Sequence, residues 1–309
     1  MAELPKVIID CDPGHDDAMA IVMAARHTNL LGITAVSGNA PLAMTAPNAL
    51  VVAQLLHLDV PVHAGADRPL VAPARHAAAV HGESGLDGPA RPTLDRTLDS
   101  ADAVQFIIDT VRAVDDVWLV PIGPLTNIAL AIRQAPDIVD RLAGISLMGG
   151  SATVGNVTAA AEFNVWADPE AAAIVFGCGV EVLRMAGLNL THQFCVDRQV
   201  IASMRACGTR TGSFGADLFE FYLSSSNRRT GQTEVALHDP CAVMAITHPE
   251  LFSFGARHVA VELVGEHTRG MTLVDERGYA SEPANCEVAY HIDRDRAMEL
   301  FLASVADSP

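Results

Sequence analysis

Four aspartates lie within eight residues near the N-terminus, where positions 10–17 read DCDPGHDD. Carboxylates packed this closely repel one another, so either some of them stay protonated or a cation lies among them. Hard carboxylate oxygens are ligands that Ca²⁺ and Mg²⁺ prefer. The cluster therefore predicts a metal site, although Asp10 taken alone is better explained as a buried structural residue.

The flanking residues predict how these aspartates are held. The apolar run Val7–Cys11 favours a strand, the Pro-Gly pair that follows favours a turn, and Ala18–Ala25 favours a helix. Side chains alternate across a strand, so Asp10 and Asp12 share one face. The two later aspartates open the helix, where carboxylates are favoured because backbone N–H groups point outward.

Strand and helix patterns alternate along the rest of the chain. This alternation predicts an α/β fold, with an open, mostly parallel, Rossmann-like sheet, helices on both faces and a small extra β/helical element. We expect a single domain over residues 1–309, with long loops at Ala64–Arg96 and Ser224–His238. The remaining predicted elements are strands at Leu31–Val36, Val60–His63, Val117–Ile122 and Ile145–Met148 and helices at Ala46–Leu56, Ala103–Val114 and Arg294–Val305.

Polar residues follow several of the predicted strands. Each has an ordinary explanation alone: Asp239, for example, could be an N-cap ahead of Pro240. In open α/β sheets, however, ligands bind beyond the carboxyl ends of the strands. Together these side chains suit a neutral, polyhydroxylated ligand bound beside a metal. The set comprises Asn39, His81, Asn156, Glu162, Asn164, His238 and Asp239.

Composition disfavours several classes of partner. The 309 residues carry 20 Lys and Arg against 37 Asp and Glu, a net charge of -17, which repels nucleic acid and anionic membranes. We find no secretory signal and no apolar run long enough to span a bilayer. The six cysteines include no CxxC pair. These features favour a cytoplasmic protein with free thiols.

Six motifs occur in a characteristic order: DCDPGHDDAMA, HGESGL, VPIGPLTNIA, LMGG, AEFN and HDPCAV. In this order the sequence resembles the nucleoside hydrolase family, and its HGESGL and HDPC segments resemble the inosine–uridine-preferring branch. The match runs from Lys6 to the predicted C-terminal helix. The resemblance implies a ribonucleoside N-glycosidase, which cleaves a nucleoside to ribose and free base.

The resemblance also implies roles for single residues. It implies a Ca²⁺ ion bound by the carboxylates of Asp12, Asp17 and Asp239 and by the carbonyl of Ile122. A water held by that ion would be the nucleophile, and Asp12 the general base. The ribose hydroxyls would be bound by Asp16, Asn39, Asn156, Glu162 and Asn164. His81 and His238 would face the base, with His238 protonating it as it leaves. Homo-oligomers, dimers or tetramers, are expected.

The sequence departs from the family in the segment Ser224–His238. Relatives of this branch often place a tyrosine there, whereas this segment has no aromatic residue and the nearest is Tyr222. It offers Arg228 and Arg229 instead, which could hydrogen-bond a pyrimidine carbonyl. Weaker stacking on a purine would favour pyrimidine nucleosides.

Two other functions deserve comparison. An aspartate-based phosphatase would use a strand followed by DxD, but it needs a lysine downstream, and the only lysine is Lys6, upstream of the motif. A non-catalytic, Ca²⁺-dependent nucleoside- or sugar-binding protein would not need a free base at Asp12 or a histidine at position 238. Both residues are present, which favours turnover.

Overall fold

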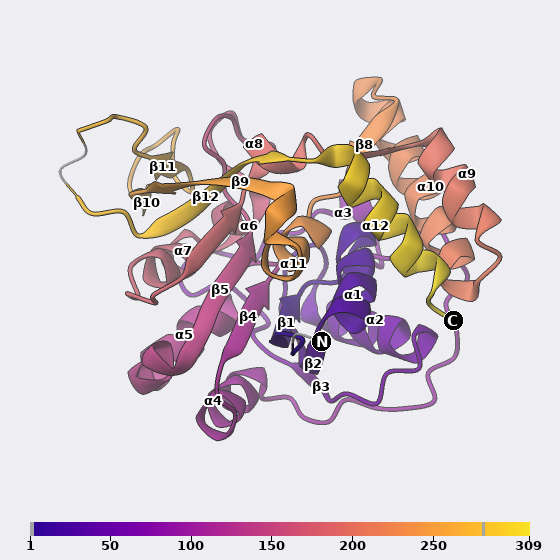
Figure 1. Ribbon diagram of the computed structural model, residues 1–309, viewed down its shortest axis with the longest axis horizontal. Coiled ribbons are helices and arrows are strands. Elements are labelled where there is room, and N and C mark those ends of the chain that lie inside the picture. Colours follow the sequence, from indigo (N-terminus) through magenta and orange to yellow (C-terminus); the bar gives the residue numbers. More distant parts are fainter. Residues whose placement is uncertain (1–2, 280–281) are drawn as a thin grey trace.

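The protein is built on one eight-stranded sheet, seen in the computed structural model of Figure 1, which describes residues 3–279 and 282–309. The strand order is β3-β2-β1-β4-β5-β6-β12-β9, and every neighbouring pair is parallel except β12 and β9. The strands are β1 Lys6–Cys11, β2 Asn29–Ala35, β3 Val62–Ala64, β4 Val117–Pro121, β5 Leu142–Met148, β6 Leu183–Ala186, β9 Phe252–Arg257 and β12 Cys286–Ile292. The predicted mostly parallel sheet is confirmed.

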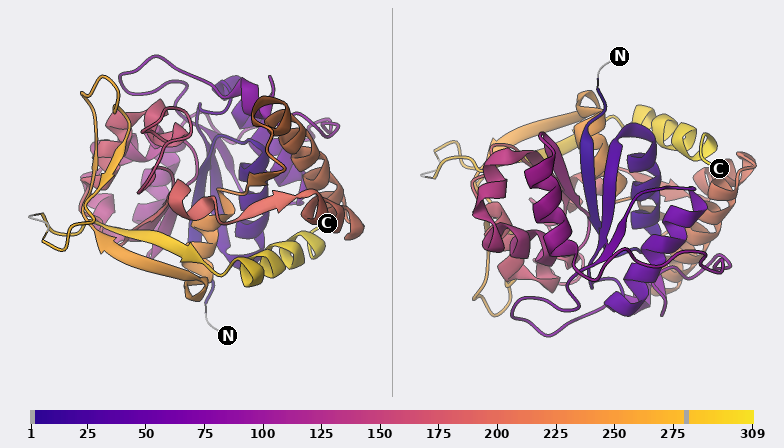
Figure 2. Two further views of the ribbon diagram at one scale, coloured as in Figure 1. Left: turned by 90° about the horizontal axis from the view of Figure 1, so that it is seen from above. Right: turned by 90° about the horizontal axis from the view of Figure 1, so that it is seen from below.

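Helices cover both faces of this sheet, as Figure 2 shows. One apolar core joins the sheet to α1, α2, α11 and α12, and a second joins it to α4, α5 and α7. Because both faces are buried, the central strands are almost wholly apolar. The helices are α1 His15–His27, α2 Leu42–Leu55, α4 Ala103–Ala113, α5 Thr126–Gln134, α7 Pro169–Phe176, α9 Arg198–Ala206, α10 Arg210–Thr230, α11 Pro240–Thr247 and α12 Arg294–Ala306.

Smaller elements lie around the main sheet and confirm the expected extra β/helical part. Two antiparallel pairs form separate ribbons, β7 with β8 and β10 with β11. No helix among the described residues is long and apolar enough to cross a membrane. The small elements are β7 Cys195–Asp197, β8 Glu234–Ala236, β10 Val259–Val261, β11 Thr272–Val274, α3 Ala78–His81, α6 Phe163–Ala167 and α8 Leu188–Thr191.

The strand order reverses between β1 and β4. From β1 the chain moves outward through β2 to β3, whereas from β4 it moves the other way through β5 to β6. The connections after β1 and β4 therefore diverge onto opposite faces and leave a crevice at the carboxyl ends of these two strands. The DCDPGHDD segment and Ile122 both lie at this point.

The long loop between β3 and α4 is fastened to the body of the protein at several points. The Leu70 N–H donates to the Asp168 carboxylate, and His76 Nδ1 lies 3.0 Å from the Gly38 carbonyl oxygen. The Arg75 guanidinium stacks 4.2 Å from the ring centre of Trp166. The expected loop is thus mostly confirmed, with the short helix α3 inside it.

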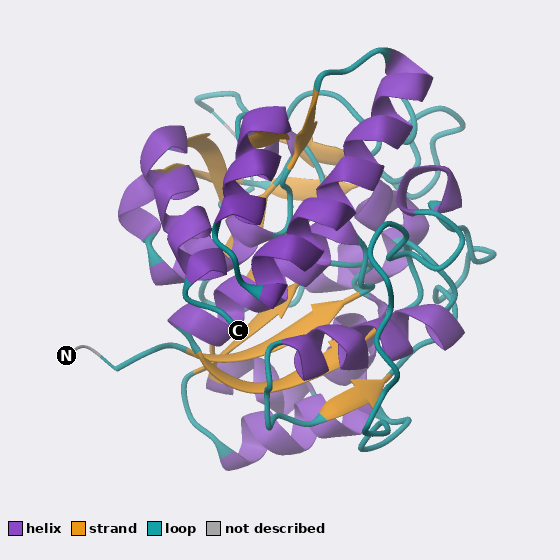
Figure 3. Ribbon diagram, turned by 90° about the vertical axis from the view of Figure 1, so that its right-hand side faces the viewer, coloured by secondary structure: helices purple, strands orange, loops and turns teal. Residues whose placement is uncertain are grey.

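The second expected loop, Ser224–His238, is wrong over its first half. Helix α10 continues to Thr230 and ends at Gly231, which adopts the left-handed conformation (φ 74°) typical of a helix C-cap. Ser225 and Ser226 are buried rather than exposed. Figure 3 shows the helices stacked in front of the sheet on this side of the molecule. The segment is therefore one end of a rigid 21-residue helix followed by β8.

Candidate active site

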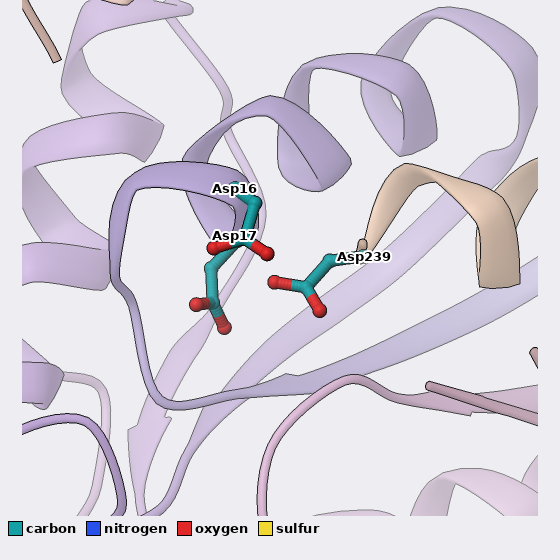
Figure 4. Close-up of side chains that lie close together, drawn as sticks. All are labelled: Asp16, Asp17 and Asp239. Carbon is teal, nitrogen blue, oxygen red and sulfur yellow. The ribbon is translucent and has the colours of Figure 1, made fainter. Parts of the chain in front are cut away.

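Three buried carboxylates converge above the sheet, as Figure 4 shows. Asp16 and Asp17 belong to the first turn of α1, and Asp239 immediately precedes α11. Ligand oxygens of the three residues lie within 4.8 Å of one another. The elements that carry them are far apart in sequence, so the fold itself creates the cluster.

Asp12 extends this cluster from the end of β1. Its Oδ2 accepts a hydrogen bond from the Asn39 N–H at 2.6 Å, while its Oδ1 is buried and has no partner among the described residues. Gly38 and Gly123 pack against the two oxygens so closely that a Cβ would lie 2.0 Å from Oδ2 or 2.4 Å from Oδ1. The chain therefore shapes a space that fits this carboxylate and leaves one oxygen for a ligand.

Asp17 and Asn39 lock the turn between β1 and α1. Asp17 Oδ1 accepts from the Asp12 N–H at 3.1 Å, and Oδ2 accepts from the Gly14 N–H at 2.8 Å. The Asn39 side-chain amide donates to Asp17 Oδ2 and to the Asp12 carbonyl. Asn39 therefore hydrogen-bonds the carboxylates of Asp12 and Asp17, whereas the sequence predicted a role for it in binding the ribose.

Burial and mutual repulsion raise the pKa values of the clustered carboxyl groups. Burial and then Asp17 raise the pKa of Asp16 to about 7, and burial raises that of Asp17 to about 6. The pKa values of Asp12 and Asp239 are raised well above the ordinary range by burial and by the other aspartates. In the charged form these groups need a compensating cation.

The residues present fit a hard divalent cation. The donors are carboxylate oxygens without a thiolate or imidazole among the cluster, which is the donor set that Ca²⁺ prefers. The unpartnered Oδ1 of Asp12 points to the same conclusion. The carboxylates that lie close enough to share a cation include Asp16, whereas the sequence analysis predicted that Asp16 binds the ribose.

The segments after β4 and β5 supply a second group of predicted residues. The Ile122 carbonyl accepts a hydrogen bond from the Asn164 side-chain amide at 2.9 Å. Glu162 caps α6, accepting from the N–H groups of Asn164, Val165 and Gly150, and burial raises its pKa to about 7. These residues therefore support one another. Asn156, by contrast, is exposed in the loop before α6, where its backbone N–H donates to the Ala161 carbonyl next to Glu162.

The histidines gather with an aromatic residue that the sequence analysis placed outside the site. His81 and His15 stack with ring centres 5.0 Å apart, and Tyr222 of α10 stacks on His15 at 5.4 Å. Burial, Asp16 and Asp239 raise the pKa of Tyr222 above its usual range. An aromatic side chain is thus present, two residues before the segment Ser224–His238 in which its absence was noted.

His238 directly precedes Asp239 in the sequence. Its Nδ1 is 2.7 Å from the Thr191 hydroxyl, and its ring centre is 5.8 Å from that of His192. Burial, and then His192, lowers the pKa of His238 to about 3, so the ring is neutral at neutral pH. A cavity of about 460 Å³ between α9 and α10 is lined by Arg198, Arg205 and Leu223 and contains none of the predicted site residues.

Sequence reasoning missed His15 and Tyr222. His15 stands inside the DCDPGHDD motif, and Tyr222 follows Phe219 at helical spacing, a signal that was available in the sequence. Buried carboxylates at the switch point of a parallel sheet, framed by amides and histidines, define the site of an α/β enzyme that binds a small polar molecule.

Comparisons with known proteins agree with this class. Residues 7–299 match the family described as inosine-uridine preferring nucleoside hydrolase. The chain is 43% identical over 296 residues to the pyrimidine-specific ribonucleoside hydrolase RihB of Escherichia coli, covering 95% of this chain and 94% of that protein. The structure of a purine-preferring ribonucleoside hydrolase from Gardnerella vaginalis has a TM-score of 0.91 at 32% identity, covering 97% and 98% of the two chains. A plant nucleoside hydrolase has the same TM-score at 31% identity, covering 98% and 99%.

The chain belongs to the inosine-uridine preferring nucleoside hydrolase family. It is a ribonucleoside hydrolase, an enzyme that cleaves the N-glycosidic bond of a nucleoside. The resemblance seen in the sequence motifs is confirmed, and the phosphatase and the non-catalytic binding protein are set aside.

Proposed function

We propose that the enzyme is Ca²⁺-dependent and that Asp12 is its general base. The observation that carries this proposal is the buried, unpartnered Oδ1 of Asp12 beside the carboxylates of Asp16, Asp17 and Asp239. Asp12, Asp17, Asp239 and the Ile122 carbonyl would hold the ion, with Asp16 at its edge. Bound Ca²⁺ would supply a positive centre that orients a water and the ribose diol and lowers the pKa of that water.

The protein groups then divide the chemistry between them. The oxygen of water attacks C1′ of the ribose, the bond from C1′ to the base nitrogen breaks, and its electron pair leaves with the base. Asp12 Oδ1 accepts the proton of the water. The carboxylates stabilise the positive charge that develops on the sugar as the bond breaks. Asp16, Asn39, Asn156, Glu162 and Asn164 are proposed to bind the ribose hydroxyls.

His238 is proposed to assist the departing base. Because the ring is neutral at neutral pH, it would donate a hydrogen bond as negative charge develops, rather than begin as a cation. The test compares His238→Ala on a natural nucleoside and on a nitrophenyl riboside, whose leaving group needs no assistance. A large loss on the first with little loss on the second supports this role, whereas equal losses assign His238 to ribose binding or structure.

Pyrimidine nucleosides are proposed as the preferred substrates. The support is the 43% identity to a pyrimidine-specific relative, against 32% to a purine-preferring one. The lack of an aromatic residue in Ser224–His238 gives no support to this preference, because Tyr222 lies beside His81. Release of free ribose from uridine, cytidine, inosine and adenosine tests the proposal, and a higher kcat/KM for the two purine nucleosides would refute it.

A further inference from the structure

His15 and His81 form a hydrogen-bonded pair at the edge of the site. Their Nδ1 atoms are 3.1 Å apart, and both rings are buried. His15 opens α1, whereas His81 ends α3 in the long loop. Two ring nitrogens at this distance must divide the roles, because one has to carry a hydrogen and the other a lone pair.

The backbone of Asp87 determines which nitrogen carries the hydrogen. His15 Nε2 lies 2.9 Å from the Asp87 carbonyl oxygen, which can only accept, so Nε2 carries the hydrogen. A neutral imidazole has one N–H, so Nδ1 of His15 is left with a lone pair. His81 Nδ1 must then be the donor, and His81 Nε2 is the unprotonated nitrogen.

A competing contact is weaker. The His15 backbone N–H lies 3.4 Å from His81 Nδ1 and would require that nitrogen to accept. His15 would then donate from both ring nitrogens and carry a buried positive charge. Neither ring hydrogen-bonds a carboxylate among the described residues that could balance such a charge. The shorter contact between the rings therefore governs the arrangement.

The surroundings fix the pair in place. Asp87 accepts from the Ser84 hydroxyl at 2.5 Å and from the Glu83 N–H, which folds the HGESGLD segment back towards α1. Gly14 lies against the His81 ring so closely that a Cβ would lie 2.7 Å from Nδ1. His81 Nε2 makes no hydrogen bond to any described residue. The His238 ring is near enough to His81 to lower the pKa of His81, after burial and His15.

We propose that His15, held by the Asp87 carbonyl, is a positioning residue that keeps His81 in the Nδ1–H tautomer. His81 Nε2 then presents a lone pair to a hydrogen-bond donor of the nucleoside, an O–H of the sugar or an N–H of the base. His15 and the HGESGLD segment thereby fix the tautomer of His81 together.

Nitrogen-15 NMR of the histidine rings tests the proposal without any turnover. Protein labelled on histidine is measured with Ca²⁺ added and after chelation, and His81→Asn assigns the signals of His81. The wild-type protein should show His81 protonated at Nδ1 and unprotonated at Nε2. The opposite tautomer in both samples would overturn the proposal, whatever any variant shows.

Two variants of His15 separate the tautomer effect from packing. His15→Phe keeps a ring against Tyr222 but removes the acceptor, so His81 should gain population of the Nε2–H form. His15→Asn places an amide oxygen near the former Nδ1 and should retain the Nδ1–H form. An unchanged His81 tautomer in a folded His15→Phe variant would overturn the proposal.

A kinetic measurement completes the test and rests on the proposed function. His15→Phe should lower kcat/KM by about 10- to 100-fold, as substitutions behind a functional histidine commonly do. His15→Asn should recover most of this loss. Equal kcat/KM losses in the two variants would assign His15 to packing alone. If nucleosides proved not to be the substrate, the NMR result would still stand, so the two failures are distinguishable.

Discussion

At the scale of single residues, the two carboxylate oxygens of Asp12 have different environments. One oxygen is fixed by the Asn39 N–H, and the other is shielded from solvent without a partner. A buried acceptor left unpaired is costly, so folding alone does not explain it. This unpaired oxygen is the reason why we propose both proton transfer and cation binding at Asp12.

Asp12→Asn should lower kcat by about 10³-fold or more, because an amide cannot accept the proton of water. Ribose affinity should fall much less, since the neighbouring carboxylates remain. Release of ribose and calorimetric titration with ribose measure the two quantities. The surface variant Asp140→Asn is the control, and an Asp12→Asn enzyme that retained most of its kcat would exclude Asp12 as the base.

Stability of the Ca²⁺-free enzyme should fall as the pH rises from about 4 to about 7. Burial raises the folded-state pKa values of Asp10, Asp16 and Glu162 to about 7, above unfolded values near 4. The folded state therefore binds more protons than the unfolded state across this window, and stability is lost as they dissociate. Thermal unfolding of chelated protein measures the trend.

Calcium should reverse that loss at neutral pH. An ion that binds only the folded state at about 100 times its Kd adds about 2.7 kcal/mol to the free energy of unfolding. Thermal unfolding at about pH 7 with and without Ca²⁺ measures the effect, and metal analysis of active protein identifies the ion. A stoichiometric transition metal, or full activity with no metal, would contradict the assignment.

The residues of the site were predictable where they follow strands. Asp12, Asn39 and Asp239 stand directly after or before regular elements, and the alternation of strand and helix predicts that such positions meet. The motif position of His15 and the helical spacing of Tyr222 mark both as candidates, but their contact with each other depends on how α10 packs beside α1, which one sequence does not reveal. The sequence likewise gave no indication that Asn156 is exposed in its loop.

At the scale of elements, α10 brings an aromatic ring to the site. The sequence of its last turns, SSSNRRT, lacks an apolar period, so a loop was expected. Packing of Leu223 and burial of Ser225 and Ser226 extend the helix nonetheless. Tertiary contacts outweigh the weak helix propensity of this segment. Gly231, in the left-handed conformation, marks the end of the helix.

Tyr222→Ala should destabilise the protein by about 3 kcal/mol and raise KM, because it removes a ring packed against both histidines. Tyr222→Phe should change stability little, since it keeps the ring. Chemical denaturation and steady-state kinetics of both variants give the comparison. A Phe variant as impaired as the Ala variant would show that the hydroxyl, and not the ring, is what the enzyme needs.

At the scale of the whole molecule, acidity limits which substrates can enter. The net charge is -17, and Glu162 is a buried carboxylate within the proposed ribose site. Uridine 5′-phosphate should therefore have a kcat/KM about 100-fold or more below that of uridine, a penalty of about 3 kcal/mol. Parallel assays of the two compounds decide this, and equal values would remove Glu162 from the 5′ end of the ribose.

Assembly is a further property of the whole chain. We expect a homo-oligomer, and exposed apolar side chains on and beside the β10–β11 ribbon, Val264 at 90% and Leu273 at 58% exposure, offer a contact surface. Light scattering should give twice or four times the 32.6 kDa chain mass. A mass of one chain at working concentration would contradict the expectation.

The order of the main sheet was only partly predictable. Alternation indicates parallel neighbours among β1 to β5, which lie close in sequence. The pairing of β12 with β6 joins residues about a hundred positions apart, and the antiparallel β9 closes that edge. Long-range pairing of this kind depends on how the whole chain packs, which local patterns do not encode.

The fastening of the long loop has a practical consequence for protein engineering. Leu70 and Arg75 are tied to the body of the enzyme, and the residues between them, positions 71–74, form a span in which Val71 is 70% exposed. Because both ends are anchored and the span is exposed, substitutions within it should change the melting temperature little. A library at positions 71–74 would therefore measure how much sequence variation an anchored surface loop accepts.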